Sequence, residues 1–190
     1  MEGKKEAQPL LRRRRWHTDH VQPNNADLFK DQALVGGDWV EAKSGKRFDV
    51  YDPGNNKVWA TAPDMAAEDA DTVCQKAHET FQTFKKTNPK QRAQWLLKWD
   101  QLIRDNRDDL AHIVTYETGK PLAEAQGELD YALGFTWWFA GEAERVQGTI
   151  QTPSAPSRRV FTVKQPIGVA VALVPWNCQY RYRQRSLKGC

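Results

Sequence analysis

The pattern of hydrophobic and polar residues changes twice along the chain. In the first stretch, residues 33–62, short strand-like segments are separated by turn residues. Residues 33–35 and 38–40 flank Gly36-Gly37, and a Pro-Gly-Asn-Asn turn joins the alternating residues 47–51 to the returning residues 57–62. Alternation is typical of strands with one buried face, and glycine supplies the positive φ that a tight turn needs. The first stretch therefore predicts two β-hairpins.

After residue 63 the apolar spacing becomes helical. Asp64 stands where a helix N-cap is expected, and the next apolar residues share one helical face up to Phe84. Cys74 belongs to this face, so we expect a buried, unreactive thiol. The face comprises Ala67, Ala70, Val73, Cys74, Ala77, Phe81 and Phe84.

Three further helices are predicted after the first. Asn88-Pro89 combines an amide cap with a first-turn proline, which favours a helix start. A third helix ends at Gly119, since glycine adopts the left-handed conformation that closes many helices. From Pro121 a fourth helix is expected to run to about Val146. The second helix carries a continuous face of Trp95, Leu96, Trp99, Leu102 and Ile103.

The last pattern has two parts on either side of Pro166. Residues 158–165 alternate as in a strand, whereas Ile167–Val174 is apolar throughout. An uninterrupted run of small and β-branched residues is typical of a strand buried on both faces. Because this run follows four helices, a helix-flanked parallel sheet and an α/β fold are expected.

Charge is concentrated at the two ends of the 190 residues. The chain has 28 basic and 24 acidic residues, a formal net charge of +4. Residues 1–30 hold seven basic and four acidic residues, and residues 178–190 hold four basic and no acidic ones. The body between them, with 17 basic and 20 acidic residues, carries −3. This distribution does not support a basic groove, so we expect no nucleic-acid partner.

The two charged ends have no clear secondary-structure pattern. Residues 1–27 include Arg12–Arg15, and we expect a disordered basic leader; a localisation signal or an anion-binding arm is the functional alternative. The longest apolar run has eight residues, far below the roughly 20 of a spanning helix, so no membrane partner is expected.

The cysteines stand far apart, at positions 74, 178 and 190. They form no Cys-x-x-Cys pair and no disulfide framework, so we expect no metal site and a reducing compartment. A cytoplasmic location follows from this. A mitochondrial presequence is the alternative, although Glu2 and Glu6 argue against it.

The chemistry is expected where the predicted buried strand ends, at Pro175-Trp176-Asn177. In open parallel sheets, ligands bind beyond the carboxyl ends of the strands. The Asn177 amide could donate hydrogen bonds to an oxygen that gains negative charge during acyl-type chemistry. Spacing alone leaves a second interpretation equally open, in which Asn177 caps a turn or a following helix.

A series of short motifs then identifies a family. The residues from about 28 to 177 resemble the N-terminal part of the aldehyde dehydrogenase superfamily, and within it the succinate-semialdehyde dehydrogenase branch. The resemblance rests on Gly36-Gly37-Asp38-Trp39-Val40, Glu117-Thr118-Gly119-Lys120-Pro121-Leu122-Ala123-Glu124-Ala125, Glu128, Tyr131, Trp138-Phe139-Ala140, Gln165-Pro166-Ile167-Gly168-Val169 and Val174-Pro175-Trp176-Asn177.

The resemblance implies NAD(P)-dependent oxidation of a small-molecule aldehyde, most of all succinate semialdehyde, to the carboxylic acid. In such enzymes a cysteine thiolate attacks the aldehyde, an asparagine amide holds the oxyanion, and a glutamate activates water. Asn177 matches that asparagine. Val174, Pro175, Trp176 and Asn177 match cofactor contacts for NAD or NADP, and Tyr131 and Phe135 match the substrate entrance.

The resemblance also implies a division of the chain. Residues 28–150 match the N-terminal part of a cofactor-binding domain, 151–165 a strand of the oligomerisation sheet, and 166–177 the first strand of a Rossmann-like parallel sheet. The expected fold is thus an incomplete N-terminal part of an aldehyde dehydrogenase fold. Full-length members are expected to form homo-oligomers, dimers or tetramers.

After Asn177 the resemblance stops, and residues 178–190 form an off-pattern basic tail. The family's nucleophilic cysteine and general-base glutamate have no match in the chain, and Cys178 is not expected to replace the nucleophile. We therefore expect a truncated product that is inactive alone. The alternative is a short non-catalytic isoform that associates with full-length subunits through the strand at Arg158–Gln165.

Overall fold

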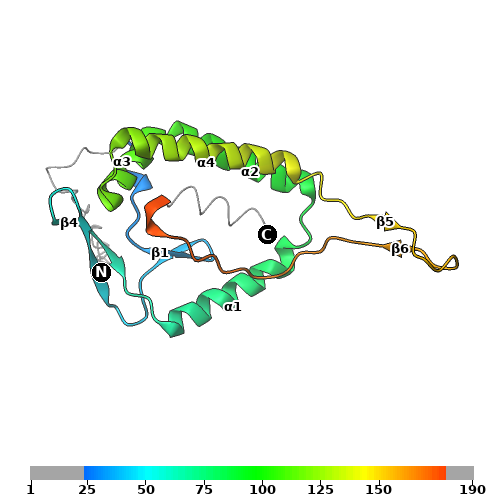
Figure 1. Cartoon of the computed structure of the whole chain (residues 1–190). Helices are drawn as coiled ribbons and strands as arrows, with labels where there is room; N and C mark the ends of the chain where they lie inside the picture. Colours follow the sequence, from blue (N-terminus) through cyan, green and yellow to red (C-terminus); the bar gives the residue numbers. More distant parts are fainter. Residues whose placement is uncertain (1–23, 179–190) are drawn as a thin grey trace, which may run out of the picture.

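The computed structural model describes residues 24–178, which form a mixed α/β arrangement of four helices and three small sheets (Figure 1). The 3₁₀ turns are Ala26–Leu28 and Trp176–Cys178. The strands are β1 (Ala33–Val35), β2 (Asp38–Val40), β3 (Arg47–Asp52), β4 (Lys57–Pro63), β5 (Ile150–Gln151) and β6 (Val160–Phe161). The helices are α1 (Ala67–Phe84), α2 (Pro89–Asp105), α3 (Arg107–Thr118) and α4 (Leu122–Glu142).

Both predicted hairpins are confirmed. Strands β1 and β2 pair antiparallel around Gly36 and Gly37, whose φ angles of 64° and 101° lie where side chains are strained. Strands β3 and β4 form a second antiparallel pair with an irregularity between Val50 and Tyr51. The alternating patterns thus predicted local pairing correctly.

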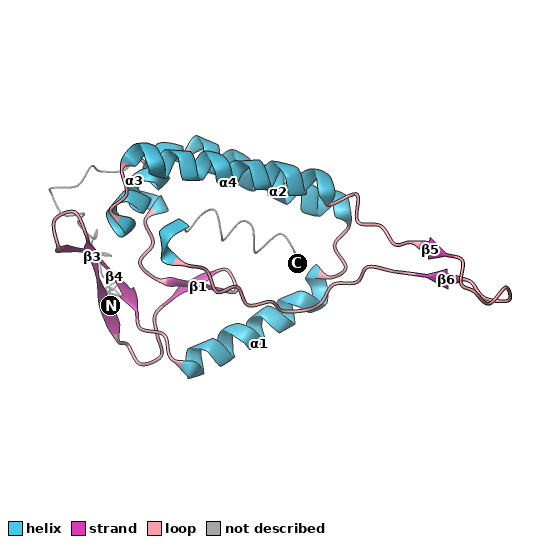
Figure 2. Ribbon diagram, viewed as in Figure 1, coloured by secondary structure: helices cyan, strands magenta, loops and turns pink. Residues whose placement is uncertain are grey.

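The core lies in a bundle of α2, α3 and α4, which run side by side (Figure 2). Helix α4 contributes most of it: Ala125 and Leu129 are fully buried, and Leu133 is nearly so. Asn88 caps α2 by accepting a hydrogen bond from the Gln91 backbone, as predicted. The remaining members of the core cluster are Ile103, Ala111 and Val114, with Trp99, Leu110 and Leu122 packed against them.

Helix α1 lies apart from this bundle (Figure 2). Two predictions about it are wrong. Its N-cap is Ala66 rather than Asp64, and the Asp69 carboxylate accepts the Ala66 N–H at 2.9 Å. Cys74 is exposed rather than buried, because α1 has no helix packed along that face within the described residues.

The end of α4 leads into an arm that extends away from the body (Figure 2). The strand predicted over Arg158–Gln165 is shorter in the structure, where β6 covers Val160–Phe161. It pairs antiparallel with β5. Its partner, β5, lies between the end of α4 and β6. Thr149 and Thr162 extend the pairing through side-chain and backbone hydrogen bonds.

The run Ile167–Val174 is not a strand in this structure, so the prediction of a buried strand at this point is wrong. No regular secondary structure occurs between β6 and Trp176. Leu173 is 94% exposed and Ile167 79% exposed. A strand buried on both faces needs hydrogen-bonding neighbours on its edges, and the described residues place no strand beside it. The Rossmann-like sheet therefore stays a prediction.

The described chain begins at Asn24, four residues before the predicted start of the body. The buried Asp109 carboxylate accepts the backbone N–H groups of Asn24 and Asn25, both at 2.9 Å. This anchors residues 24–25 at the start of α3. The rest of the predicted basic leader and the tail 179–190 lie outside the described residues.

Candidate functional site

The segment that carries the predicted site contacts the helical bundle through the side chain of Lys120. The Lys120 ammonium donates a hydrogen bond to the backbone carbonyl of Asn177 at 2.9 Å and pairs with the carboxylate of Glu128. The Glu128 side chain is only 5% exposed and that of Lys120 14% exposed. A nearly buried ion pair therefore contacts the turn that contains Asn177, the predicted catalytic residue.

Local sequence explains the position of Lys120. Helix α3 ends at Gly119, which adopts the left-handed conformation with φ 72°, and α4 starts after Pro121. Lys120 therefore lies in the three-residue connection between α3 and α4. Glu128 follows two turns into α4, on the face that holds Ala125 and Leu129, so its carboxylate points into the bundle and requires a cation.

The predicted cofactor contacts occupy the exposed end of the segment. Trp176 is 75% exposed and Val174 37% exposed, and Pro175 between them is also exposed. Asn177 lies in the 3₁₀ turn Trp176–Cys178 with an exposed side chain. The structure therefore keeps these four residues together and accessible to a ligand.

The two predicted entrance residues lie together on α4. The rings of Tyr131 and Phe135 meet edge to face with centroids 5.1 Å apart. Tyr131 is 47% exposed, and Phe135 is half-buried. The two rings are one turn apart and form a single aromatic surface. Glu128, three residues before Tyr131, belongs to the buried face of the same helix.

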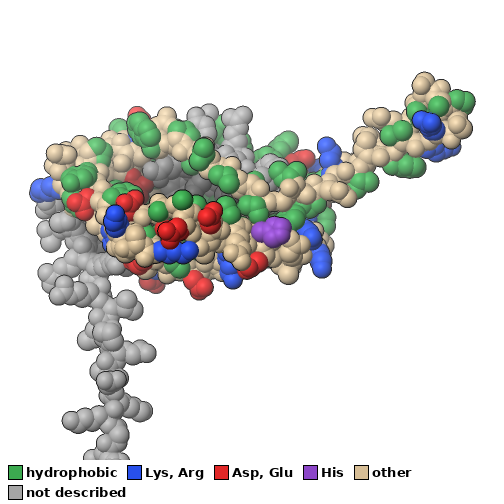
Figure 3. Space-filling view, turned by 90° about the horizontal axis from the view of Figure 1, so that it is seen from below, with side chains coloured by type: hydrophobic (Ala, Val, Ile, Leu, Met, Phe, Trp, Pro, Cys, Tyr) green, Lys and Arg blue, Asp and Glu red, His purple; other side chains and the backbone are tan. Residues whose placement is uncertain are grey.

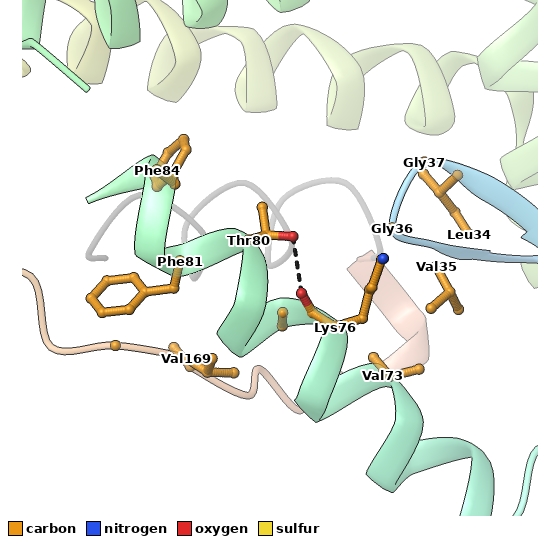
Figure 4. A pocket seen from close by; sticks show the side chains of 13 residues that line it. Leu34, Val35, Gly36, Gly37, Val73, Lys76, Thr80, Phe81, Phe84 and Val169 are labelled. Carbon is orange, nitrogen blue, oxygen red and sulfur yellow. Dashed lines mark hydrogen bonds between the residues drawn. The ribbon is translucent and has the colours of Figure 1, made fainter. Parts of the chain in front are cut away.

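A separate apolar groove of about 530 Å³ lies between α1 and the β1–β2 turn (Figure 4). Its walls include Val73, Phe81 and Phe84 of α1, and Val169 of the exposed run. Lys76 is the titratable side chain among its lining residues, and none of the predicted site residues lines it. The groove therefore offers one ammonium group and one hydroxyl, from Lys76 and Thr80, among mainly apolar walls.

The described residues contain neither a candidate metal cluster nor a helix long and apolar enough to cross a bilayer. Of the two described thiols, Cys74 is exposed on α1 and Cys178 is half-buried beside Asn177. An ion pair elsewhere on the bundle joins α3 to α4: Arg107 forms two hydrogen bonds to Asp130, and these lower the pKa of the Asp130 carboxyl.

Comparison with known proteins decides the family. The model of the "Aldehyde dehydrogenase family" matches residues 39–181, which include the β3–β4 hairpin, the helices α1 to α4 and the turn with Asn177. The chain belongs to the aldehyde dehydrogenase family. It spans about a third of the length of the curated members that it matches, since it covers 30–32% of the two relatives described next.

Two relatives and one solved structure show which members are similar. The chain is 44% identical over 149 residues to succinate-semialdehyde dehydrogenase [NADP(+)] 1 of Schizosaccharomyces pombe, and this match covers 78% of the chain. It is 46% identical over 158 residues to 3-sulfolactaldehyde dehydrogenase of Pseudomonas putida, covering 83% of the chain. The crystal structure of succinate-semialdehyde dehydrogenase from Burkholderia pseudomallei superposes with a TM-score of 0.85 at 37% identity; the match covers 88% of this chain and 35% of that one.

The pair Lys120–Glu128 is the feature that sequence reasoning missed. Both Glu128 and Lys120 contributed to the family resemblance, but no contact between them was predicted. The available signal was a carboxylate at helical spacing between Ala125, Leu129 and Ala132, since a charge on a buried helix face needs a partner. Even so, the sequence does not indicate that the partner also holds the carbonyl of Asn177.

Proposed function

We propose that this chain is the N-terminal portion of an NAD(P)-dependent aldehyde dehydrogenase that oxidises a carboxylate-bearing semialdehyde, most of all succinate semialdehyde, to the acid. The observation that carries the proposal is the family match, which runs through the turn with Asn177. The name of the Schizosaccharomyces pombe relative supports succinate semialdehyde as the aldehyde. The name of the Pseudomonas putida relative, an enzyme of sulfolactaldehyde, keeps a sulfonated aldehyde as the alternative.

The proposed catalytic contribution of this chain is the side-chain amide of Asn177. When a thiolate adds to the aldehyde carbon, the carbonyl oxygen becomes an oxyanion, and an amide N–H can stabilise it by a hydrogen bond. The exposure of Asn177 supports this role, because a donor must be accessible to the reacting oxygen. The rings of Tyr131 and Phe135 are proposed to border the path of the aldehyde.

The proposed cofactor is NAD or NADP, held by Val174, Pro175, Trp176 and Asn177. Their exposure offers backbone groups and one large aromatic face to a ligand, which fits a contact made mainly through the chain itself. A bound NAD or NADP supplies the hydride acceptor of the oxidation. The name of the Schizosaccharomyces pombe relative favours NADP.

The 190 residues by themselves are proposed to be inactive, because the family's nucleophile and general base have no match in them. Mixing the purified chain with succinate semialdehyde and NAD or NADP should give no absorbance of reduced cofactor. Turnover by the chain alone would contradict this proposal. The cytoplasm is the proposed location, with the mitochondrion as the alternative.

A chimera tests the proposed reaction directly. Residues 1–177 of this chain are joined to the part of the Schizosaccharomyces pombe relative that follows the matching asparagine. The folded chimera should reduce NADP with succinate semialdehyde, and Asn177→Ala should lower kcat by about 10²–10³-fold, as the loss of one oxyanion donor does. Gln94→Ala, which removes an exposed amide on α2, is the matched control and should leave kcat unchanged.

A second candidate function is a non-catalytic subunit that associates with full-length members. The arm favours it: Figure 3 shows the arm projecting from the body with hydrophobic side chains along it. Ile150 is 72% exposed and Phe161 63% exposed. Co-purification of the chain with a full-length homologue should be lost in the variant Phe161→Asp. Association that survives this substitution would exclude the arm as the contact.

A further inference from the structure

One ammonium group connects the bundle to the turn that carries Asn177. Lys120 Nζ contacts Glu128 Oε2 and also lies 2.9 Å from the Asn177 backbone oxygen, across 57 residues of sequence. An ammonium has three N–H donors, so it can serve both acceptors at once. The carbonyl, rather than the side-chain amide, is the group that is held.

The two ends of this contact differ in how firmly they are fixed. Lys120 and Glu128 are held by the connection between two packed helices and by the core face of α4. The segment on the other side has no regular secondary structure from residue 162 to residue 175, and most of its side chains are exposed. The lysine therefore supplies a fixed point for a segment with little packing of its own.

We propose that Lys120, with its charge balanced by Glu128, is a positioning residue that fixes the turn Trp176–Cys178 through the carbonyl of Asn177. The consequence for catalysis rests on the proposed function. A hydrogen-bond donor to an oxyanion must be held within about 0.5 Å of its productive position. Holding the backbone leaves both N–H groups of the Asn177 side chain available for that oxygen.

The sequence offers an unusually selective probe for this contact. Asn177-Cys178 is the one Asn-Cys dipeptide in the 190 residues. If asparagine is labelled with ¹³C at its backbone carbonyl and cysteine with ¹⁵N, a carbonyl–amide correlation spectrum of the full chain gives one peak, from this peptide group alone. Loss of a hydrogen bond to a carbonyl moves its ¹³C resonance upfield, so the peak reports the contact with Lys120.

The variants are chosen so that the bundle stays folded. Lys120→Met alone would deprive a buried carboxylate of its ammonium, so the principal variant is the double substitution Lys120→Met with Glu128→Leu, which removes both charges together. Arg107→Met with Asp130→Leu is the matched control. It removes an ion pair between α3 and α4 that has no contact with Asn177.

The double variant at Lys120 and Glu128 should shift the ¹³C resonance upfield, and Lys120→Arg, which keeps a charged donor, should stay closer to the wild-type position. The control pair should leave the peak in place. An unmoved peak in the folded Lys120→Met with Glu128→Leu variant would overturn the proposal, as would an equal shift in the control. The readout needs neither cofactor nor turnover, so an inactive chimera with a Lys120-dependent peak would refute the proposed function alone.

Discussion

The helical bundle and the run Ile167–Val174 both carry large apolar side chains, yet these side chains have opposite environments. In α4, Leu129 is fully buried, whereas Leu173 in the run is 94% exposed. The bundle helices follow one another in sequence, so each finds its packing partner within a short stretch of chain. A buried strand needs neighbours on both edges, and the described residues contain none for this run. Apolar composition thus decides burial only where the partner is also present.

The largest expected effect comes from removing the same side chain in the two regions. Leu129→Ala should lower the free energy of unfolding by about 2–5 kcal/mol, because it opens a cavity in the bundle. Leu173→Ala should change it by no more than about 0.5 kcal/mol, since the side chain is exposed. Urea denaturation followed by circular dichroism measures both. Equal losses of unfolding free energy at the two positions would contradict the difference in burial between the bundle and the run.

A buried hydrogen bond gives the next effect. Thr136 Oγ1 donates to Asp100 Oδ1 at 2.6 Å between α4 and α2, where both side chains are buried. Thr136→Val should cost about 1–3 kcal/mol of unfolding free energy, because the Asp100 carboxylate loses a buried donor. Thr83→Val on exposed α1 is the control and should stay within about 0.5 kcal/mol.

The start of the bundle provides a smaller test. Asn88 Oδ1 accepts the Gln91 N–H at 2.8 Å and caps α2. Asn88→Ala should lower the free energy of unfolding by about 1 kcal/mol, the usual cost of losing an N-cap. Thermal unfolding measures this change. A stability equal to that of the unmodified chain would mean that α2 does not depend on its cap.

The smallest effect concerns pH. The hydrogen bonds from Arg107 lower the folded-state pKa of Asp130 below its ordinary value of 3.8. The ion pair therefore stabilises the fold above pH 3.8, and this contribution is lost as the pH falls through the lower folded-state pKa. Because the Asp130 side chain is 55% exposed, the contribution should be below about 1 kcal/mol.

Asp130→Asn measures this contribution. The variant should be slightly less stable than the unmodified chain at pH 7, and the difference should shrink as the pH falls below about 4. Denaturation curves at several pH values give the comparison. A difference that grows at low pH would have the wrong sign and would contradict the role of the ion pair.

Much of the fold could be predicted from the sequence because its signals are local. Gly36-Gly37, Asn88-Pro89 and Gly119 each act within a few residues, and each marked its turn, cap or helix end correctly. Cys74 was misplaced because helical spacing shows that a face is apolar without showing what covers it. The run Ile167–Val174 failed for the same reason, since its pattern assumed strands beside it.

The residues of the candidate site stay a prediction from the sequence, and the contact that supports their turn was not predicted. Asn177 and its neighbours were found through the family resemblance. The contact between Lys120 and Asn177 joins positions 57 residues apart, and no periodic pattern relates them. Glu128 alone gave a signal, as a carboxylate on a buried helix face. Local sequence patterns thus give no access to the long-range contacts that hold a segment in place.

Amide hydrogen exchange of the 190-residue chain, followed by mass spectrometry, tests the central contrast most directly. We expect slow exchange for the peptides of α2, α3 and α4, whose amides are hydrogen-bonded and packed, and fast exchange across residues 167–174 in the same sample. Strong protection of residues 167–174 would contradict this expectation, because that result would mean that the run is a paired strand and that Asn177 is held by a sheet rather than by Lys120.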